Sequence, residues 1–233
     1  NDKRRLAHKI SDFIYTHFTG GPGYFDSRIV FVSEFGSKTN PKKKISVVDY
    51  DGKNMMDLTD GRFLTLTPQF APNENYVMYV SYENRIPKVY LQKVEPYSKK
   101  KLVGEFSGMS FAPRFHPNGS SGIMSINSDE GTHLYQINFT NNKLRRMTWG
   151  KDHIDTSPSY SPDGTKIAYS SDRSGSLQLY VMNLKTGKSK KISFGGGGYA
   201  APAWSPTGDL IAFTKFQGGQ FHIGVVKPDG SGE

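Results

Sequence analysis

Short runs of alternating hydrophobic and polar residues fill most of the chain, and turn residues separate one run from the next. Within residues 157–192, two such runs, 167–170 and 177–182, each follow a turn rich in proline, glycine, serine or aspartate. Period-two alternation between such turns is typical of short β-strands. The segment therefore predicts four strands in one antiparallel sheet.

The same pattern recurs along the chain at a nearly constant interval. Each copy begins with a proline that precedes an aromatic residue by two positions, and the intervals between these prolines are 45, 45 and 44 residues. A propeller blade of four strands takes about 40–45 residues. The many turn residues and the β-branched and aromatic content exclude a solenoid of helix pairs. We therefore predict an all-β fold, a β-propeller of four-stranded antiparallel blades. The repeating prolines are Pro68, Pro113, Pro158 and Pro202.

The first residues follow a helical period instead. A glycine-rich stretch, residues 19–23, ends this pattern, so we expect one N-terminal α-helix followed by a linker in residues 1–23 and the propeller in residues 24–233. The apolar stripe of this helix needs a surface to pack against. The stripe consists of Leu6, Ile10, Phe13, Ile14 and Phe18.

The first and last blades lack a strand in this pattern. Residues 24–60 contain three strand-like runs without an opening proline, and the blade that begins near residue 199 has no closing run. We therefore expect about five blades in an incomplete ring. Unpaired strand edges at both ends of such a ring favour association.

Charge and composition exclude several classes of function. The net charge is +9, but the lysine and arginine clusters recur at equivalent positions of successive repeats. We therefore expect them on the solvated outer edges of the blades, and we expect no nucleic-acid partner. No run approaches the roughly 20 apolar residues of a membrane helix, so we expect no membrane span. The absence of cysteine excludes disulfides and cysteine nucleophiles.

No motif for catalysis, a cofactor or a metal emerges from the sequence. It contains no Gly-x-Ser-x-Gly, His-Glu-x-x-His or phosphate-loop pattern. The six histidines share no ligand spacing, so they would form a site only if the fold gathered them. We predict no catalytic, cofactor-binding or metal-binding residues.

The loops before the repeating prolines are the candidate site. They occupy equivalent positions in successive blades, so they emerge on one face around the central channel, where loops on a rigid scaffold commonly carry function. The alternative is that they are ordinary connectors. The partner-binding residues predicted here are Met109, Ser110, Ala112, His153, Asp155, Thr156, Tyr199 and Ala200.

Three segments closely resemble one known family. They are residues 1–15 (NDKRRLAHKISDFIY), 23–32 (GYFDSRIVFV) and 48–52 (VDYDG). They resemble TolB, the family of periplasmic propellers of the Tol-Pal system, and the resemblance covers nearly the whole chain. The Trp-Ser-Pro turn motif is common among propellers, whereas the helix with its Phe-Asp-Ser-Arg junction is specific. The resemblance implies a ring of six blades and makes residues 1–23 the end of an N-terminal α/β domain that is otherwise missing.

The resemblance also implies a function without catalysis. Members bind the lipoprotein Pal on the channel face, bind TolA through an N-terminal segment missing here, and support outer-membrane integrity and envelope constriction during cell division. Colicins exploit the same face in some members. The Pal-binding positions correspond to Met109, Ala112 and Thr156, and Met109 replaces the histidine that is usual there.

Two other classes of protein remain open at this point. One is the propeller of a prolyl-oligopeptidase-like serine peptidase, which a Gly-x-Ser-x-Gly segment beyond Glu233 would indicate. The other is a saccharide-processing propeller, which would need acidic or histidine side chains converging in the channel.

Overall fold

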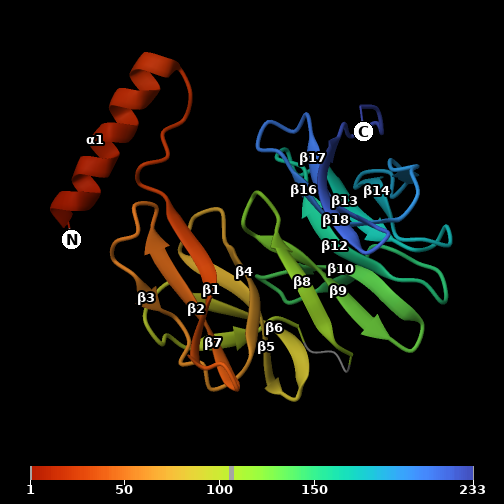
Figure 1. Ribbon diagram of the computed structural model, residues 1–233, viewed down its shortest axis with the longest axis horizontal. Coiled ribbons are helices and arrows are strands. Elements are labelled where there is room, and N and C mark those ends of the chain that lie inside the picture. The colour runs from red at the N-terminus through yellow and green to blue at the C-terminus, as the bar shows by residue number, and fades with distance from the viewer. Residues whose placement is uncertain (1, 105–107, 233) are drawn as a thin grey trace.

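The structure is a computed structural model that describes residues 2–104 and 108–232. In this part of the chain one helix, α1 (Asp2–Thr19), precedes eighteen strands in five antiparallel sheets (Figure 1). The fold confirms the predicted propeller, with three strands in the first and fifth blades and four in each of the others. The strands are, in blade 1, β1 (Arg28–Ser37), β2 (Asn40–Asp49) and β3 (Met56–Asp57); in blade 2, β4 (Thr65–Phe70), β5 (Tyr76–Asn84), β6 (Ile86–Lys93) and β7 (Lys100–Leu102); in blade 3, β8 (Ser110–Phe115), β9 (Ser121–Ser128), β10 (Gly131–Asn138) and β11 (Leu144–Arg146); in blade 4, β12 (Asp155–Tyr160), β13 (Lys166–Ser171), β14 (Gln178–Asn183) and β15 (Ser189–Lys191); and in blade 5, β16 (Gly198–Trp204), β17 (Ile211–Gln217) and β18 (Gln220–Val226).

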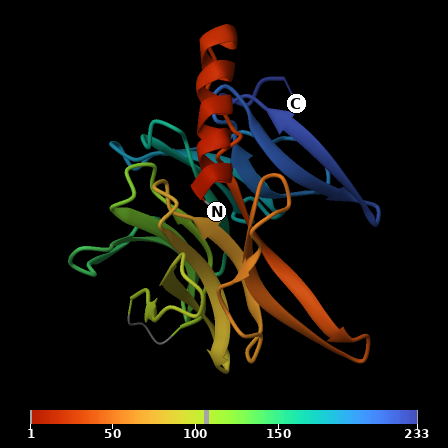
Figure 2. The same ribbon diagram turned by 90° about the vertical axis from the view of Figure 1, so that its left-hand side faces the viewer.

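Strands that follow one another in sequence are neighbours in every blade. The opening strands of blades 2 to 5, which are β4, β8, β12 and β16, contact one another from blade to blade, so they lie nearest the axis of the ring. The sheets fan out from this centre (Figures 1 and 2). The loops that enter the opening strands consequently meet at one end of the ring.

Hydrophobic clusters lie between neighbouring blades. One cluster joins Leu179 and Ile192 of blade 4 to Tyr199 and Phe213 of blade 5, and all four side chains are buried. Another joins Ile123 and Leu134 of blade 3 to residues of blade 4. Strands such as β13 and β14 are buried in an almost unbroken run, so both faces of the sheet contact neighbouring blades.

The opening strands share a β-bulge that the sequence pattern does not predict. The residue before each repeating proline has a left-handed backbone, and the pairing register shifts at this point in all four strands. Proline has no N–H to donate to the neighbouring strand, so the pairing is interrupted there in any case. The left-handed residues are Thr67 (φ 49°), Ala112 (φ 50°), Ser157 (φ 53°) and Ala201 (φ 50°).

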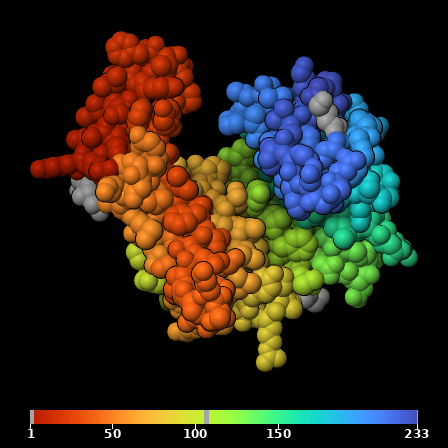
Figure 3. All heavy atoms as spheres, viewed as in Figure 1, coloured from red at the N-terminus to blue at the C-terminus, as the bar shows by residue number. Residues whose placement is uncertain are grey.

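One side of the ring is open. Strands of each blade make extensive contacts with strands of the next blade, from blade 1 to blade 5. The described strands of blade 5 make no such extensive contacts with those of blade 1. Figure 3 shows a hollow in the surface, with α1 and the first blade on one side and the blue fifth blade on the other. Large apolar side chains of β18 are exposed here, namely Phe221, Ile223 and Val225.

Helix α1 is attached to the first blade at a few polar points. The carboxylate of Asp12 accepts hydrogen bonds from the backbone N–H groups of Phe25 (2.6 Å) and Asp26 (3.0 Å). Asp51 forms ion pairs with Arg4 and His8. The apolar stripe of the helix is exposed, so it does not pack on the propeller.

Among the described residues, no helix has the length and apolar character needed to span a membrane.

Candidate functional site

The channel face is the end of the ring at which the chain enters β4, β8, β12 and β16. Its loops lie beside the hairpin turns of the same or the neighbouring blade. The N–H of Asn127 donates to the carbonyl of Met109 (2.9 Å), and the N–H of Tyr199 donates to Leu177 (2.8 Å). Thr132 of blade 3 forms an isolated parallel bridge with Ile154, just before blade 4. These backbone contacts hold the loops in fixed positions.

Four of the eight predicted partner-binding residues offer side-chain surface on this face. Met109 precedes β8 and is 39% exposed, and Ala112, Thr156 and Ala200 are partly buried within the opening strands. The hydroxyl of Ser125 in blade 3 lies 3.4 Å from that of Thr156 in blade 4, so Thr156 stands at a blade junction. A partner placed over the channel could touch these positions directly.

The other predicted residues are mostly buried. The hydroxyl of Ser110 accepts a hydrogen bond from the N–H of Val89 (3.0 Å), which ties blade 3 to blade 2. Tyr199 packs against Phe213 with ring centroids 5.3 Å apart. Neither Ser110 nor Tyr199 can contact a partner without rearrangement, so their contribution to such a surface is to position it. Asp155 and His153 belong to a separate cluster.

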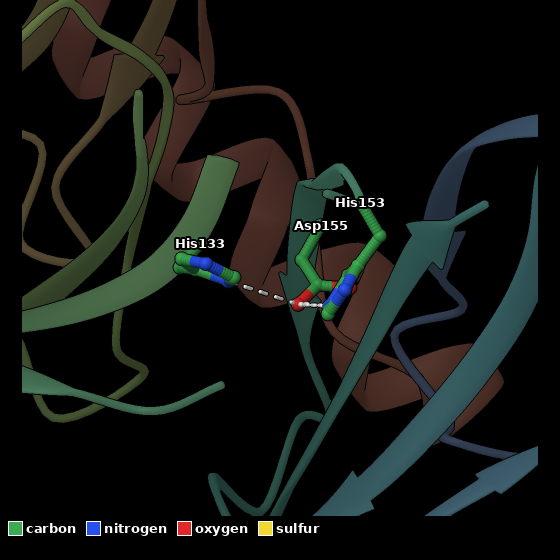
Figure 4. Close-up of side chains that lie close together, drawn as sticks. All are labelled: His133, His153 and Asp155. Carbon is green, nitrogen blue, oxygen red and sulfur yellow. Dashed lines mark hydrogen bonds and ion pairs between the residues drawn. The ribbon is translucent and has the colours of Figure 1, made fainter. Parts of the chain in front are cut away.

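This cluster brings His153 and Asp155 together with His133, a residue of β10 that the sequence did not single out (Figure 4). The Oδ2 atom of Asp155 lies 3.2 Å from Nε2 of His153 and 3.6 Å from Nδ1 of His133. The side chains of His133 and Asp155 are fully buried, and that of His153 is 11% exposed. One potential metal ligand from blade 3 therefore meets two from the entry to blade 4.

Strong hydrogen bonding keeps the Asp155 carboxylate charged. Burial alone would raise its pKa, but hydrogen bonds from Ser171, Arg173 and Thr148 outweigh that effect and hold the pKa of Asp155 below its usual range. The guanidinium of Arg173 donates to Oδ1 (2.7 Å), so Oδ2 is the oxygen that faces the histidines. The carboxylate is thus both ionised and fixed in orientation.

The sequence could not reveal this cluster because its members have no regular spacing. His133 lies 20 residues before His153 and in a different blade. Their approach depends on the bridge between Thr132 and Ile154, a contact between blades that leaves no local pattern in the sequence. Thr132, His133 and Leu134 are buried in an unbroken run, so no alternation along β10 marks the side to which His133 points.

A hollow of about 590 Å³ lies farther along the channel face, between the loops of blades 4 and 5. Its lining is mainly apolar and includes Leu177, Gly198, Phe216 and Phe221. It lies next to the predicted residues Tyr199 and Ala200 in sequence and extends the candidate surface toward the open side of the ring. The face thus combines Met109, Ala112, Thr156 and Ala200 with an apolar recess.

Comparison with known proteins places the fold in a family. A family model described as the TolB beta propeller domain matches residues 15–233. The chain belongs to this family. A Tol-Pal system protein TolB from Gluconobacter oxydans is 44% identical over 230 residues, which are 99% of this chain and 51% of the relative. The TolB of Rickettsia prowazekii is 49% identical over 131 residues, which are 56% of this chain and 29% of the relative. The chain thus spans about half the length of the Gluconobacter protein.

Solved structures agree with this membership. The crystal structure of TolB from Acinetobacter baumannii matches with a TM-score of 0.81 and 28% identity, over 97% of this chain and 56% of that one. A puromycin hydrolase matches with a TM-score of 0.69 but only 10% identity, over 86% of this chain and 34% of the hydrolase. The second likeness shows the propeller fold alone and gives no support to a peptidase function.

Proposed function

We propose that this chain is the propeller of a non-catalytic scaffold of the Tol-Pal system, located in the periplasm, which binds the lipoprotein Pal on its channel face. Through that contact, and through TolA bound by a segment outside this chain, the protein would support outer-membrane integrity and envelope constriction during division. The observation that carries the proposal is the 44% identity to a Tol-Pal system protein over almost the whole chain. The aligned stretch spans 99% of this chain.

The chemistry of the channel face supports a protein partner. Met109 offers a flexible apolar side chain, Thr156 a hydroxyl, and Ala112 a small surface on a bulged, rigid strand. Protein interfaces likewise combine an apolar centre with a polar rim. The apolar hollow beside Phe216 and Phe221 adds a recess for a larger side chain.

The proposal predicts that Thr156→Arg in the full-length protein disrupts Pal binding. Thr156 is partly buried at the junction of blades 3 and 4, so an arginine there would project into a docked partner and misplace a charge. We expect a loss of about 2 kcal/mol or more, as for a central interface residue. Isothermal titration calorimetry with purified Pal measures the affinity, and thermal unfolding verifies that the variant is folded.

The matched control is Thr186→Arg. Thr186 is an exposed threonine in the turn between β14 and β15, and its neighbour Leu184 bonds to Thr165 in the turn after β12, at the opposite end of the ring. This variant should bind Pal as the unchanged protein does. Unchanged affinity in a folded Thr156→Arg protein would mean that the channel face is not the Pal site.

A further inference from the structure

The cluster of His133, His153 and Asp155 has the dimensions of a metal site. The three candidate ligand atoms all lie within 4.8 Å of one another. Two ligands bound to one tetrahedral zinc ion at about 2.0–2.1 Å lie about 3.3 Å apart. Oδ2 of Asp155 lies 3.2 Å from Nε2 of His153 and 3.6 Å from Nδ1 of His133, and both distances are close to this ligand–ligand separation. The histidine rings stand at 80° to each other with their centroids 5.3 Å apart, so their nitrogens converge on the carboxylate without stacking.

One nitrogen of each histidine faces a backbone carbonyl. Nε2 of His133 lies 3.3 Å from the carbonyl of Glu130, and Nδ1 of His153 lies 3.1 Å from the carbonyl of Lys151. A carbonyl oxygen only accepts hydrogen bonds, so the nitrogen facing it must carry the N–H. The other nitrogen of each ring, Nδ1 of His133 and Nε2 of His153, faces Asp155.

This arrangement brings three potential ligand atoms close together. Nδ1 of His133 is buried and has no hydrogen-bond partner, which is costly for a polar atom. It lies 3.6 Å from Oδ2 of Asp155, and Nε2 of His153 lies 3.2 Å from the same oxygen. Arg173 holds the other oxygen of the carboxylate. A cation bound between these atoms would give Nδ1 of His133 a partner.

We propose that His133, His153 and Asp155 bind a divalent transition-metal ion of the zinc class. Two imidazole nitrogens and one carboxylate oxygen suit zinc, whereas calcium takes six to eight oxygen ligands. The carbonyls of Glu130 and Lys151 and the guanidinium of Arg173 orient the ligands in the way that outer-shell partners of metal sites do. A water could complete the coordination from the side of His153, which at 11% exposure is the least buried of the three side chains.

The bound ion would join blade 3 to blade 4 at the channel face. His133 belongs to β10, whereas His153 and Asp155 flank the entry to β12 and lie next to Thr156. The metal would therefore fix the loop that presents Thr156. Metal binding itself does not depend on the identity of any protein partner.

The test uses full-length protein that carries no affinity-tag histidines and has been stripped of metal with a chelator. Zinc is titrated in competition with a chromophoric chelator, and cobalt(II) is titrated separately as a spectroscopic probe. We expect one zinc ion per chain, visible absorption of the intensity typical of four-coordinate cobalt, and a higher melting temperature with zinc because the ion binds the folded state.

The variant His153→Gln should weaken zinc binding at least about tenfold, since even outer-shell changes at metal sites cost that much. His153 lies in a loop, so this variant is expected to fold. His133→Gln tests the buried ligand, and its melting temperature without metal verifies its fold. The control is His222→Gln, which removes an exposed histidine of β18 and should leave zinc affinity unchanged.

Two results would overturn the proposal. One is unchanged zinc affinity in a folded His153→Gln or His133→Gln protein, which would place the ion elsewhere. The other is the absence of zinc and cobalt binding in the unsubstituted protein. In that case a proton shared between the histidines and Asp155, rather than a metal, satisfies the cluster.

Discussion

The left-handed residue before each repeating proline is the most unusual backbone feature of the chain. Threonine, alanine and serine occupy these positions, although residues with a Cβ lose about 1–2 kcal/mol in this conformation. The four residues nevertheless share φ values between 49° and 53°. The bulge and the proline that follows impose the conformation, so the strain recurs once in each of blades 2 to 5.

At this scale we predict that Ala201→Val destabilises the protein by about 1–2 kcal/mol, because a β-branched side chain is poorly tolerated at positive φ. Ala203→Val is the matched control, since Ala203 is also exposed on β16 but is not among the left-handed residues. Valine favours strands, so the control should be neutral or slightly stabilising. Equal stabilities of the two variants in urea unfolding would show that the bulge carries no strain.

At the scale of secondary-structure elements, the sequence predicts the strands better than it predicts the contacts between blades. The runs at residues 167–170 and 177–182 coincide with β13 and β14 because alternation and turn residues act locally. The short fourth strands and the first blade without its opening proline were also predicted from local pattern. The approach of His133 to Asp155 depends on how two blades meet, so it could not be predicted from local sequence.

The junction between α1 and the first blade leaves no room for a side chain at Gly23. A Cβ there would lie 2.6 Å from the Cα of Asp12, the residue that binds the N–H groups of Phe25 and Asp26. Glycine at this position therefore allows the helix and the linker to approach each other. The polar contacts of Asp12 can form only at that distance.

We predict that Gly23→Ala separates α1 from the propeller. Hydrogen exchange at Phe25 and Asp26 should become faster, and proteases should cut the linker more readily, while the melting temperature of the blades changes little. The control is Gly21→Ala, because a Cβ on Gly21 would meet only the Thr19 hydroxyl, at 3.6 Å. If the Phe25 amide is equally protected from hydrogen exchange in both variants, this account of the junction is wrong.

On the scale of the whole molecule, the open side of the ring leaves apolar surface without a cover. Residues 221, 223 and 225 alternate along β18 and therefore share one face of the fifth sheet. Ile223 is 80% exposed, although residues of this type are usually buried. An exposed outer strand also presents unpaired backbone groups, so this side favours association.

We predict that the isolated chain self-associates through this side and that Ile223→Lys weakens the association. A lysine on an outer strand opposes pairing with a second strand. Sedimentation velocity over a range of concentrations measures the effect. The control is Tyr97→Lys, which replaces a 65% exposed aromatic residue outside the strands and should leave association unchanged. A strictly monomeric unsubstituted chain would refute the prediction.

The position of the hydrophobic clusters between blades, rather than at the centre of the ring, affects how the molecule would come apart. Each of the three middle sheets is stabilised by two neighbours, as in a linear array with nearest-neighbour coupling. The first and fifth sheets each have one such neighbour, so a mechanical load would detach them before the third. Tension applied at the ends of the chain would therefore unzip the protein sheet by sheet from the open side, and the junction of the third and fourth blades would be among the last to yield.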